Sequence, residues 1–165
     1  MIIINKRNLF FLISVWLLST LLSAQNVTIS TPHTQLLLSV PNGGTPEQLY
    51  YGSRTSDADI RSICETARRR NAYPVYGMGY PCETALSVRH ADGNLTLQMA
   101  VIGVKETRLT KENATLTVIE LKDKVYPFFV NICYKAWQDA DVIETWTEIR
   151  HEEKKPVQLL SLIHI

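Results

Sequence analysis

The stretch TLTVIELKDKVYPFFVNICYKAWQDADVIETWTEIRH, residues 115–151, decides the fold. Val125–Trp137 and Val142–His151 are runs rich in β-branched and aromatic residues, a composition typical of strands. Only the polar segment Gln138-Asp139-Ala140-Asp141 lies between them. Strands joined by so short a connection pair antiparallel, so the stretch predicts a hairpin.

The same alternation of strands and turns extends toward the N-terminus. Glu106–Thr110 and Thr115–Leu121 flank the turn Lys111-Glu112-Asn113-Ala114. Ala85–His90 and Leu95–Val104 flank Ala91-Asp92-Gly93-Asn94, in which Asp-Gly signals another hairpin. The apolar residues that share one face of the second run are Leu95, Leu97, Met99 and Val101. Shorter strand-like runs with the turn Pro41-Asn42-Gly43-Gly44 come earlier, at Val27–Ser30, Gln35–Val40 and Gln48–Tyr51.

Successive strands with short polar turns predict an all-β fold, an antiparallel β-sandwich. Only Ser56–Arg70 departs from this pattern, because its apolar residues recur with the spacing of one helix face. Ser56 or Asp57 can serve as the N-cap, and three arginines follow at the end that suits the helix dipole. We therefore expect one short helix around residues 57–70.

The composition excludes several classes of protein. The chain has 165 residues, with 17 Lys and Arg against 16 Asp and Glu, so its formal charge of +1 gives no basis for binding nucleic acid. Seven Gly and seven Pro exclude collagen-like and low-complexity chains. The size suits one domain rather than a (β/α)8 barrel, which takes about 250 residues.

Residues 1–24 have the order of a secretory signal peptide. Lys6 and Arg7 form a positive region, an apolar run extends from Leu9 to Leu22, and small residues precede a cleavage point after Ala24. The alternative, a membrane anchor, needs about 20 apolar residues, more than this run holds. We expect an exported chain, periplasmic or extracellular, with no membrane association after cleavage.

Three cysteines remain in the exported part, and their state is open between two interpretations. In an oxidising compartment Cys64 and Cys82 are the best candidates for a bridge, because both fall in or near one irregular segment. Alternatively Cys64, Cys82 and Cys133 are three thiols that act as small hydrophobic side chains. No CxxC motif is present to indicate redox catalysis or zinc binding.

No motif in the sequence indicates catalysis, a metal or a cofactor. The four histidines are scattered without ligand spacing, and no nucleophile elbow or phosphate-binding loop occurs. Glu144 and Glu148 share a strand face, but four residues separate their Cα atoms by about 13 Å. A glycosidase pair needs carboxyl groups within about 5–9.5 Å, so we assign no catalytic residue.

The segment Tyr73–Glu83, YPVYGMGYPCE, has two interpretations. Its aromatic and glycine content suits a loop that presents tyrosine faces and hydroxyls to a sugar ring. Its turn chemistry also suits a Pro- and Gly-rich crossover between sheets, with Tyr73 and Tyr76 filling the core.

Four motifs in order resemble the N-terminal β-sandwich domain of glycoside hydrolase family 36 α-galactosidases, in the style of the exported enzymes of Bacteroidetes-type bacteria. They are Tyr73–Leu86 (YPVYGMGYPCETAL), Ser87–Asn94 (SVRHADGN), Leu121–Phe128 (LKDKVYPF) and Asp141–Ile149 (DVIETWTEI). The resemblance covers residues 27–159. It implies a β-supersandwich that precedes a (β/α)8 barrel, and this barrel carries both catalytic aspartates of a retaining mechanism.

The resemblance also implies roles and partners. Such a domain packs on its own barrel, supports homo-oligomerisation and can lend a loop to the rim of an active site that hydrolyses terminal α-galactosides of oligosaccharides. On this chain the rim residues would be Tyr76, Met78, Tyr80 and Glu83. Relatives carry an acidic-aromatic-arginine triplet where this sequence has Tyr80-Pro81-Cys82. The chain by itself would be an inactive fragment of the hydrolase.

Residues 160–165, LSLIHI, are the peptide that one reading frame of a common transposon-library adapter encodes. We interpret them as a non-native tail after a domain that spans residues 25–159, the alternative being a genuine last strand. Two other functions stay open from the residues alone. One is a stand-alone secreted β-sandwich that binds glycans, and the other is a structural interaction domain that binds no sugar.

Overall fold

The computed structural model describes residues 25–163. The predicted signal peptide therefore lies outside the described residues, as do the last two positions of the chain. Within the described part, ten strands form three antiparallel sheets, and no helix has the length and apolarity that crossing a membrane requires. The predicted all-β sandwich is confirmed.

Sheet A has the order β1-β2-β3-β4, and sheet C has the order β6-β7-β8-β9. Sheet B is the pair β10-β5. The strands of sheet A are β1 (Gln25–Ser30), β2 (Thr34–Val40), β3 (Glu47–Ser53) and β4 (Arg70–Asn71). Those of sheet C are β6 (Met99–Leu109), β7 (Ala114–Asp123), β8 (Phe128–Trp137) and β9 (Val142–His151), with the short 3-10 helix η1 (Thr110–Glu112) between the first two. Sheet B consists of β5 (Leu86–Arg89) and β10 (Gln158–Leu162).

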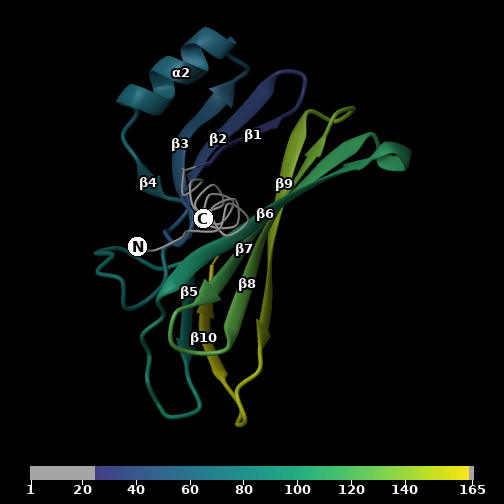
Figure 1. Ribbon diagram of the computed structural model, residues 1–165. Coiled ribbons are helices and arrows are strands. Elements are labelled where there is room, and N and C mark those ends of the chain that lie inside the picture. The colour runs from purple at the N-terminus through teal and green to yellow at the C-terminus, as the bar shows by residue number, and fades with distance from the viewer. Residues whose placement is uncertain (1–24, 164–165) are drawn as a thin grey trace, which may run out of the picture.

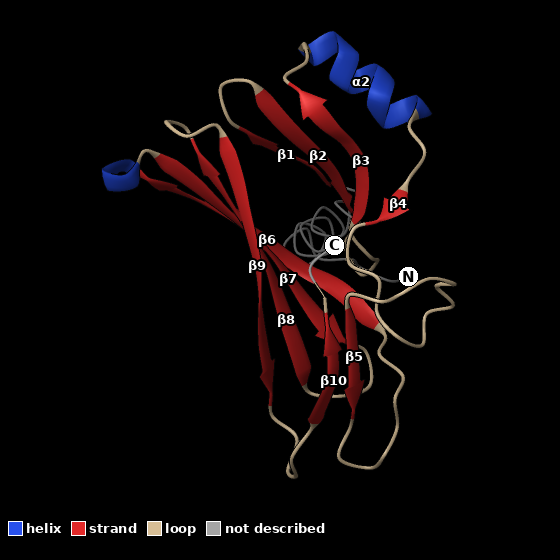
Figure 2. Ribbon diagram, turned by 180° about the vertical axis from the view of Figure 1, so that it is seen from behind, coloured by secondary structure: helices blue, strands red, loops and turns tan. Residues whose placement is uncertain are grey.

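The long strands of sheet C face sheet A toward one end and sheet B toward the other (Figures 1 and 2). Strict alternation in β8 sends Phe128, Val130 and Ile132 into the core, where they are almost fully buried. One core cluster joins all three sheets, because it also contains side chains from β1, β2, β5, β6 and β7. Backbone hydrogen bonds between Val101 of β6 and the turn at Gly43 and Gly44 connect sheets A and C directly.

Helix α2 (Asp57–Thr66) connects β3 to β4, and it is shorter than the sequence predicted. Ser56 is its N-cap and forms a capping box with Asp59, which confirms the predicted start. The helix ends at Thr66, so the expected arginines of its last turn lie beyond it. Arg70 already pairs with Gln48 in sheet A, which requires an extended backbone there.

Two strand predictions were wrong. The predicted hairpin between Ala85–His90 and Leu95–Val104 does not form, because β5 pairs with β10 instead. The turn at Asp92-Gly93 does form, closed by a hydrogen bond from the Gly93 amide to the His90 carbonyl. The two strands expected on either side of Lys105 are one strand, β6, with an irregularity in register between Val101 and Gly103.

Candidate functional site

The loop of residues 76–83, which we call the rim loop, is fixed at its base by the neighbouring backbone. The Tyr76 amide donates to the Leu86 carbonyl over 3.1 Å, and the Tyr76 carbonyl accepts from the Leu97 amide over 3.0 Å. Val75 also forms an isolated parallel bridge with Leu86. The loop therefore leaves the core at a fixed point beside β5.

Two glycines shape the rim loop. Gly77 has φ +99° and Gly79 has φ +72°, a region that favours glycine. At Gly77 space is a second constraint, because a Cβ there would lie 2.6 Å from Thr96 Cγ2. Gly79 has open space around the same position. The path of the loop thus depends on Gly77 in particular.

The structure brings together three of the four residues that the sequence placed at the rim. Tyr76, Tyr80 and Glu83 line one open hollow of about 520 Å³, whereas Met78 is exposed but does not line it. Tyr73 is only 6% exposed and lies in the core, while Tyr76 is 48% exposed. The crossover interpretation is therefore right for Tyr73 and wrong for Tyr76.

The chemistry available at this hollow is that of binding. Two phenol rings and the Glu83 carboxylate offer flat apolar faces together with hydrogen-bonding groups, a combination that suits sugars. Cys82 also lines the hollow and is a free thiol. Within residues 25–163, no three side chains of metal-ligating type gather at one place.

The three cysteines are free, so the bridge between Cys64 and Cys82, one of the two interpretations, is absent. Cys64 belongs to α2 and accepts a hydrogen bond from the Asn26 side chain of β1 over 3.2 Å. Cys82 is exposed on the rim loop and Cys133 is buried in β8. The alternative interpretation, three separate thiols, describes the structure.

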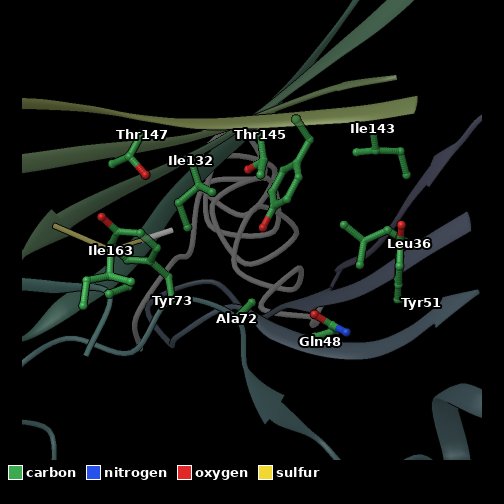
Figure 3. A pocket seen from close by; sticks show the side chains of 12 residues that line it. Leu36, Gln48, Tyr51, Ala72, Tyr73, Ile132, Ile143, Thr145, Thr147 and Ile163 are labelled. Atoms are coloured by element: carbon green, nitrogen blue, oxygen red, sulfur yellow. The ribbon is translucent and has the colours of Figure 1, made fainter. Parts of the chain in front are cut away.

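A second hollow, the inter-sheet cavity, lies between sheets A and C and has a volume of about 340 Å³. Figure 3 shows its lining, with the Tyr73 hydroxyl directed toward Thr147 of β9. Other hydroxyls in the lining belong to Tyr134, Thr145 and the exposed Tyr51, and Gln48 contributes an amide. Apolar walls complete it, at Leu36, Ala72, Ala85, Ile132, Ile143 and Ile163.

A third feature is a group of contacting side chains in the loops beside sheet C. It consists of His90, Asp92, Tyr126 and Glu153, and we call it the His90 cluster. His90 is fully buried, with Nδ1 2.7 Å from Glu153 Oε1 and its ring stacked on Tyr126 at 3.7 Å between centroids. The Tyr126 hydroxyl donates to Asp92 over 2.7 Å. The Asn94 backbone amide and then the Tyr126 hydroxyl lower the pKa of Asp92.

No local pattern in the sequence predicts the His90 cluster. Its Asp92-Gly93 turn was recognised, but Glu153 lies 63 positions from His90 and carries no local signal of contact. The Glu153 carboxylate also accepts the Ala91 amide over 3.0 Å. Among the buried side-chain nitrogen and oxygen atoms of the described residues, His90 Nε2 is one of two without a hydrogen-bond partner. The contacts of His90, Asp92, Tyr126 and Glu153 connect three loops.

Residues 25–163 therefore form an antiparallel β-sandwich that presents an exposed aromatic loop shaped by two glycines. Residues 44–164 match the family model described as the glycosyl hydrolase family 36 N-terminal domain. This match covers most of the chain, and the chain belongs to that family.

Solved structures of three α-galactosidases share the fold. The Geobacillus stearothermophilus enzyme AgaA, solved as a variant with raffinose, is 15% identical with a TM-score of 0.74, covering 84% of this chain and 24% of that one. The Lactobacillus brevis enzyme is 16% identical with a TM-score of 0.65, covering 76% of this chain and 21% of that one. The galactosidase domain of the α-galactosidase-sucrose kinase AgaSK is 20% identical with a TM-score of 0.69, covering 82% of this chain and 23% of that one.

The chain therefore spans about a quarter of the length of the α-galactosidases whose fold it shares. No curated protein matches it in sequence.

Proposed function

We propose that this chain is the N-terminal, non-catalytic domain of an α-galactosidase that hydrolyses terminal α-galactosides of oligosaccharides. The family membership of residues 44–164 carries this proposal. The shared fold of α-galactosidases about four times as long supports it. In the proposed enzyme a (β/α)8 barrel supplies both catalytic aspartates and retains configuration.

In this proposal the domain positions the barrel and contributes its rim loop to the substrate entrance. Tyr76 and Tyr80 are the contacts we favour, because their exposed rings line one hollow with Glu83. Stacking on an aromatic ring suits the apolar face of a sugar, and a phenol hydroxyl can hydrogen-bond its edge. The same domain would contribute to an interface between enzyme subunits.

We also propose that the enzyme is exported, through the signal peptide of residues 1–24. N-terminal sequencing of the secreted protein tests this, because cleavage after Ala24 would leave Gln25 first. A mature protein that still begins at Met1 would contradict it.

The first experiment reads the source DNA beyond codon 159, in clones that do not end in adapter sequence. We expect an open frame that continues for several hundred codons and encodes the barrel with its two aspartates. The complete enzyme should release nitrophenol from p-nitrophenyl α-galactoside, whereas the 165-residue chain should release none. A stop codon directly after codon 165 would refute the proposal.

A second experiment tests the rim loop in the complete enzyme. Tyr80→Ala should raise KM for raffinose severalfold with little change in kcat, because it removes a contact made equally in ground and transition states. Val125→Ala is the control, since Val125 is exposed but lies outside the hollow. Equal KM values for Tyr80→Ala and the control would show that Tyr80 of the rim loop does not contact the substrate.

A further inference from the structure

We propose that the inter-sheet cavity is a second binding site, separate from the rim loop, which takes one neutral monosaccharide. Its polar lining comes from β3, β8, β9 and the segment before the rim loop, all upstream of the predicted tail. Of the tail residues that the structure describes, 160–163, only Ile163 reaches the wall. The volume of about 340 Å³ is within the usual range of ligand pockets, about 300–1,000 Å³.

The Tyr73 hydroxyl is the observation that points to a ligand. Tyr73 is 94% buried, and its phenol oxygen makes no hydrogen bond of normal geometry among the described residues. Its nearest polar neighbour is Thr147, whose hydroxyl lies beside it in Figure 3 and opposes the rise that burial causes in the pKa of Tyr73. A buried polar group without a partner destabilises a fold, so such groups are rare in native proteins. A bound hydroxyl compound would supply the missing partner.

The uncharged lining of the cavity favours a neutral ligand. Among residues 25–163, no Lys, Arg, Asp, Glu or His lines the cavity, so a charged ligand would lose its hydration without gaining an opposite charge. The hydroxyls of Tyr73, Thr145 and Thr147 can each donate and accept a hydrogen bond. Sugar hydroxyls have the same dual capacity, and they match this lining better than a ligand that only accepts.

The apolar walls select a ring with a nonpolar face. Leu36, Ile132 and Ile143 come from both sheets, and they alternate with the hydroxyl groups along the lining. A pyranose presents C–H groups on its faces and hydroxyls at its edge, and the C–H groups pack well on tyrosine rings. The cavity therefore offers both kinds of contact that one sugar ring needs.

Galactose titrated into the isotope-labelled 165-residue chain, followed by NMR, tests the site. We expect saturable shifts at the amides of Tyr73, Tyr134, Thr145 and Thr147. Tyr73→Phe keeps the ring and removes only the hydroxyl, so the Kd should rise about two- to tenfold. Thr147→Val, nearly the same shape, should raise it similarly. Tyr50→Phe removes the same atom from a residue of β3 outside the cavity and should leave this Kd unchanged.

The spectra of the free variants also show whether each one is folded. Three results would overturn the proposal: no saturable shift with galactose, glucose or mannose, the same Kd in Tyr73→Phe and Thr147→Val as in the unmodified chain, or shifts confined to the rim loop. Saturation by cyclohexanol without saturation by any sugar would also refute the sugar class. None of these results bears on the reading frame or the activity of the complete enzyme, so the proposed function is tested independently of this site.

Discussion

Tyr134 and Cys133 are neighbours in β8 that face opposite sides of sheet C, and both are buried. Burial raises the pKa of Tyr134 to about 12. For Cys133, burial together with the negative charge of Glu148 raises the pKa to about 11. Both side chains therefore stay protonated and neutral in the folded protein at pH values where an unfolded chain would already ionise them.

The raised pKa of Tyr134 predicts a specific loss of stability in alkali. Because the folded pKa is above the ordinary value of 10.0, the stabilisation is complete below pH 10 and is lost as the pH rises toward 12. Tyr134→Phe should make the decline of the unfolding free energy in this range shallower, as measured by urea denaturation. Tyr50→Phe, outside the core, is the control. Identical slopes in Tyr134→Phe and the unmodified chain would refute the prediction.

The cysteines should differ in their reaction with iodoacetamide. Cys82 is exposed and should be alkylated within the native protein, whereas Cys133 is 1% exposed, has a raised pKa and should react only after unfolding. Mass spectrometry of peptides after timed labelling measures both rates. A peptide that links Cys64 to Cys82 would contradict the free thiols of the structure.

At the scale of elements, the sequence predicted best where contacts are local. The β8–β9 hairpin was predictable because a polar segment of four residues separates two long strand-like runs. The end of α2 was not, because Arg70 is held extended by its pairing with Gln48 in β3, 22 positions away. The partner of β5 was equally hidden, since nothing near Leu86 specifies Gln158–Leu162.

The candidate site followed the same division. The glycines and tyrosines of the rim loop are adjacent in sequence, and their composition offered two interpretations, a loop facing a sugar and a crossover with Tyr76 in the core. The inter-sheet cavity combines Gln48, Tyr73 and Thr147, which come together only after the sheets pack. No local pattern marks residues of this kind.

The rim loop predicts a difference between two glycines. Gly77→Ala places a methyl group 2.6 Å from Thr96 at a φ of +99°, so the loop or Thr96 must move. Gly79→Ala has the positive φ without the close contact. Gly77→Ala should therefore destabilise the domain by about 1–3 kcal/mol more than Gly79→Ala. Thermal denaturation measures this, and equal Tm values would show that the contact relaxes freely.

At the scale of the molecule, Asp141 connects sheets A and C. It lies in the β8–β9 turn, accepts the Thr31 hydroxyl and accepts the His33 amide over 3.0 Å. The Thr31 hydroxyl first, and then the His33 amide, lower the pKa of Asp141. A second link joins the same ends of the sheets, where the Gln138 side chain donates to the Ser30 carbonyl over 3.0 Å.

Asp141→Asn should lower Tm by a few degrees at pH 7, because the amide tolerates the φ of +52° but lacks the charge. A lowered folded pKa stabilises the protein above the ordinary value of 3.8, and this stabilisation is lost as the pH falls through the folded pKa. The Tm difference should therefore shrink in acid. A difference as large in acid as at pH 7 would mean that the charge of Asp141 is not its cause.

The pairing of β5 with Gln158 and Leu159, the part of β10 before the predicted tail, determines when the sandwich can be completed on the ribosome. Sheet C is built from hairpins between consecutive strands, whereas Arg89 pairs with Gln158 across about 70 residues. At about 5–20 residues per second, β5 emerges from the ribosome several seconds before its partner is synthesised. For those seconds both edges of β5 lack a partner strand, so the nascent chain has its greatest need of a chaperone then.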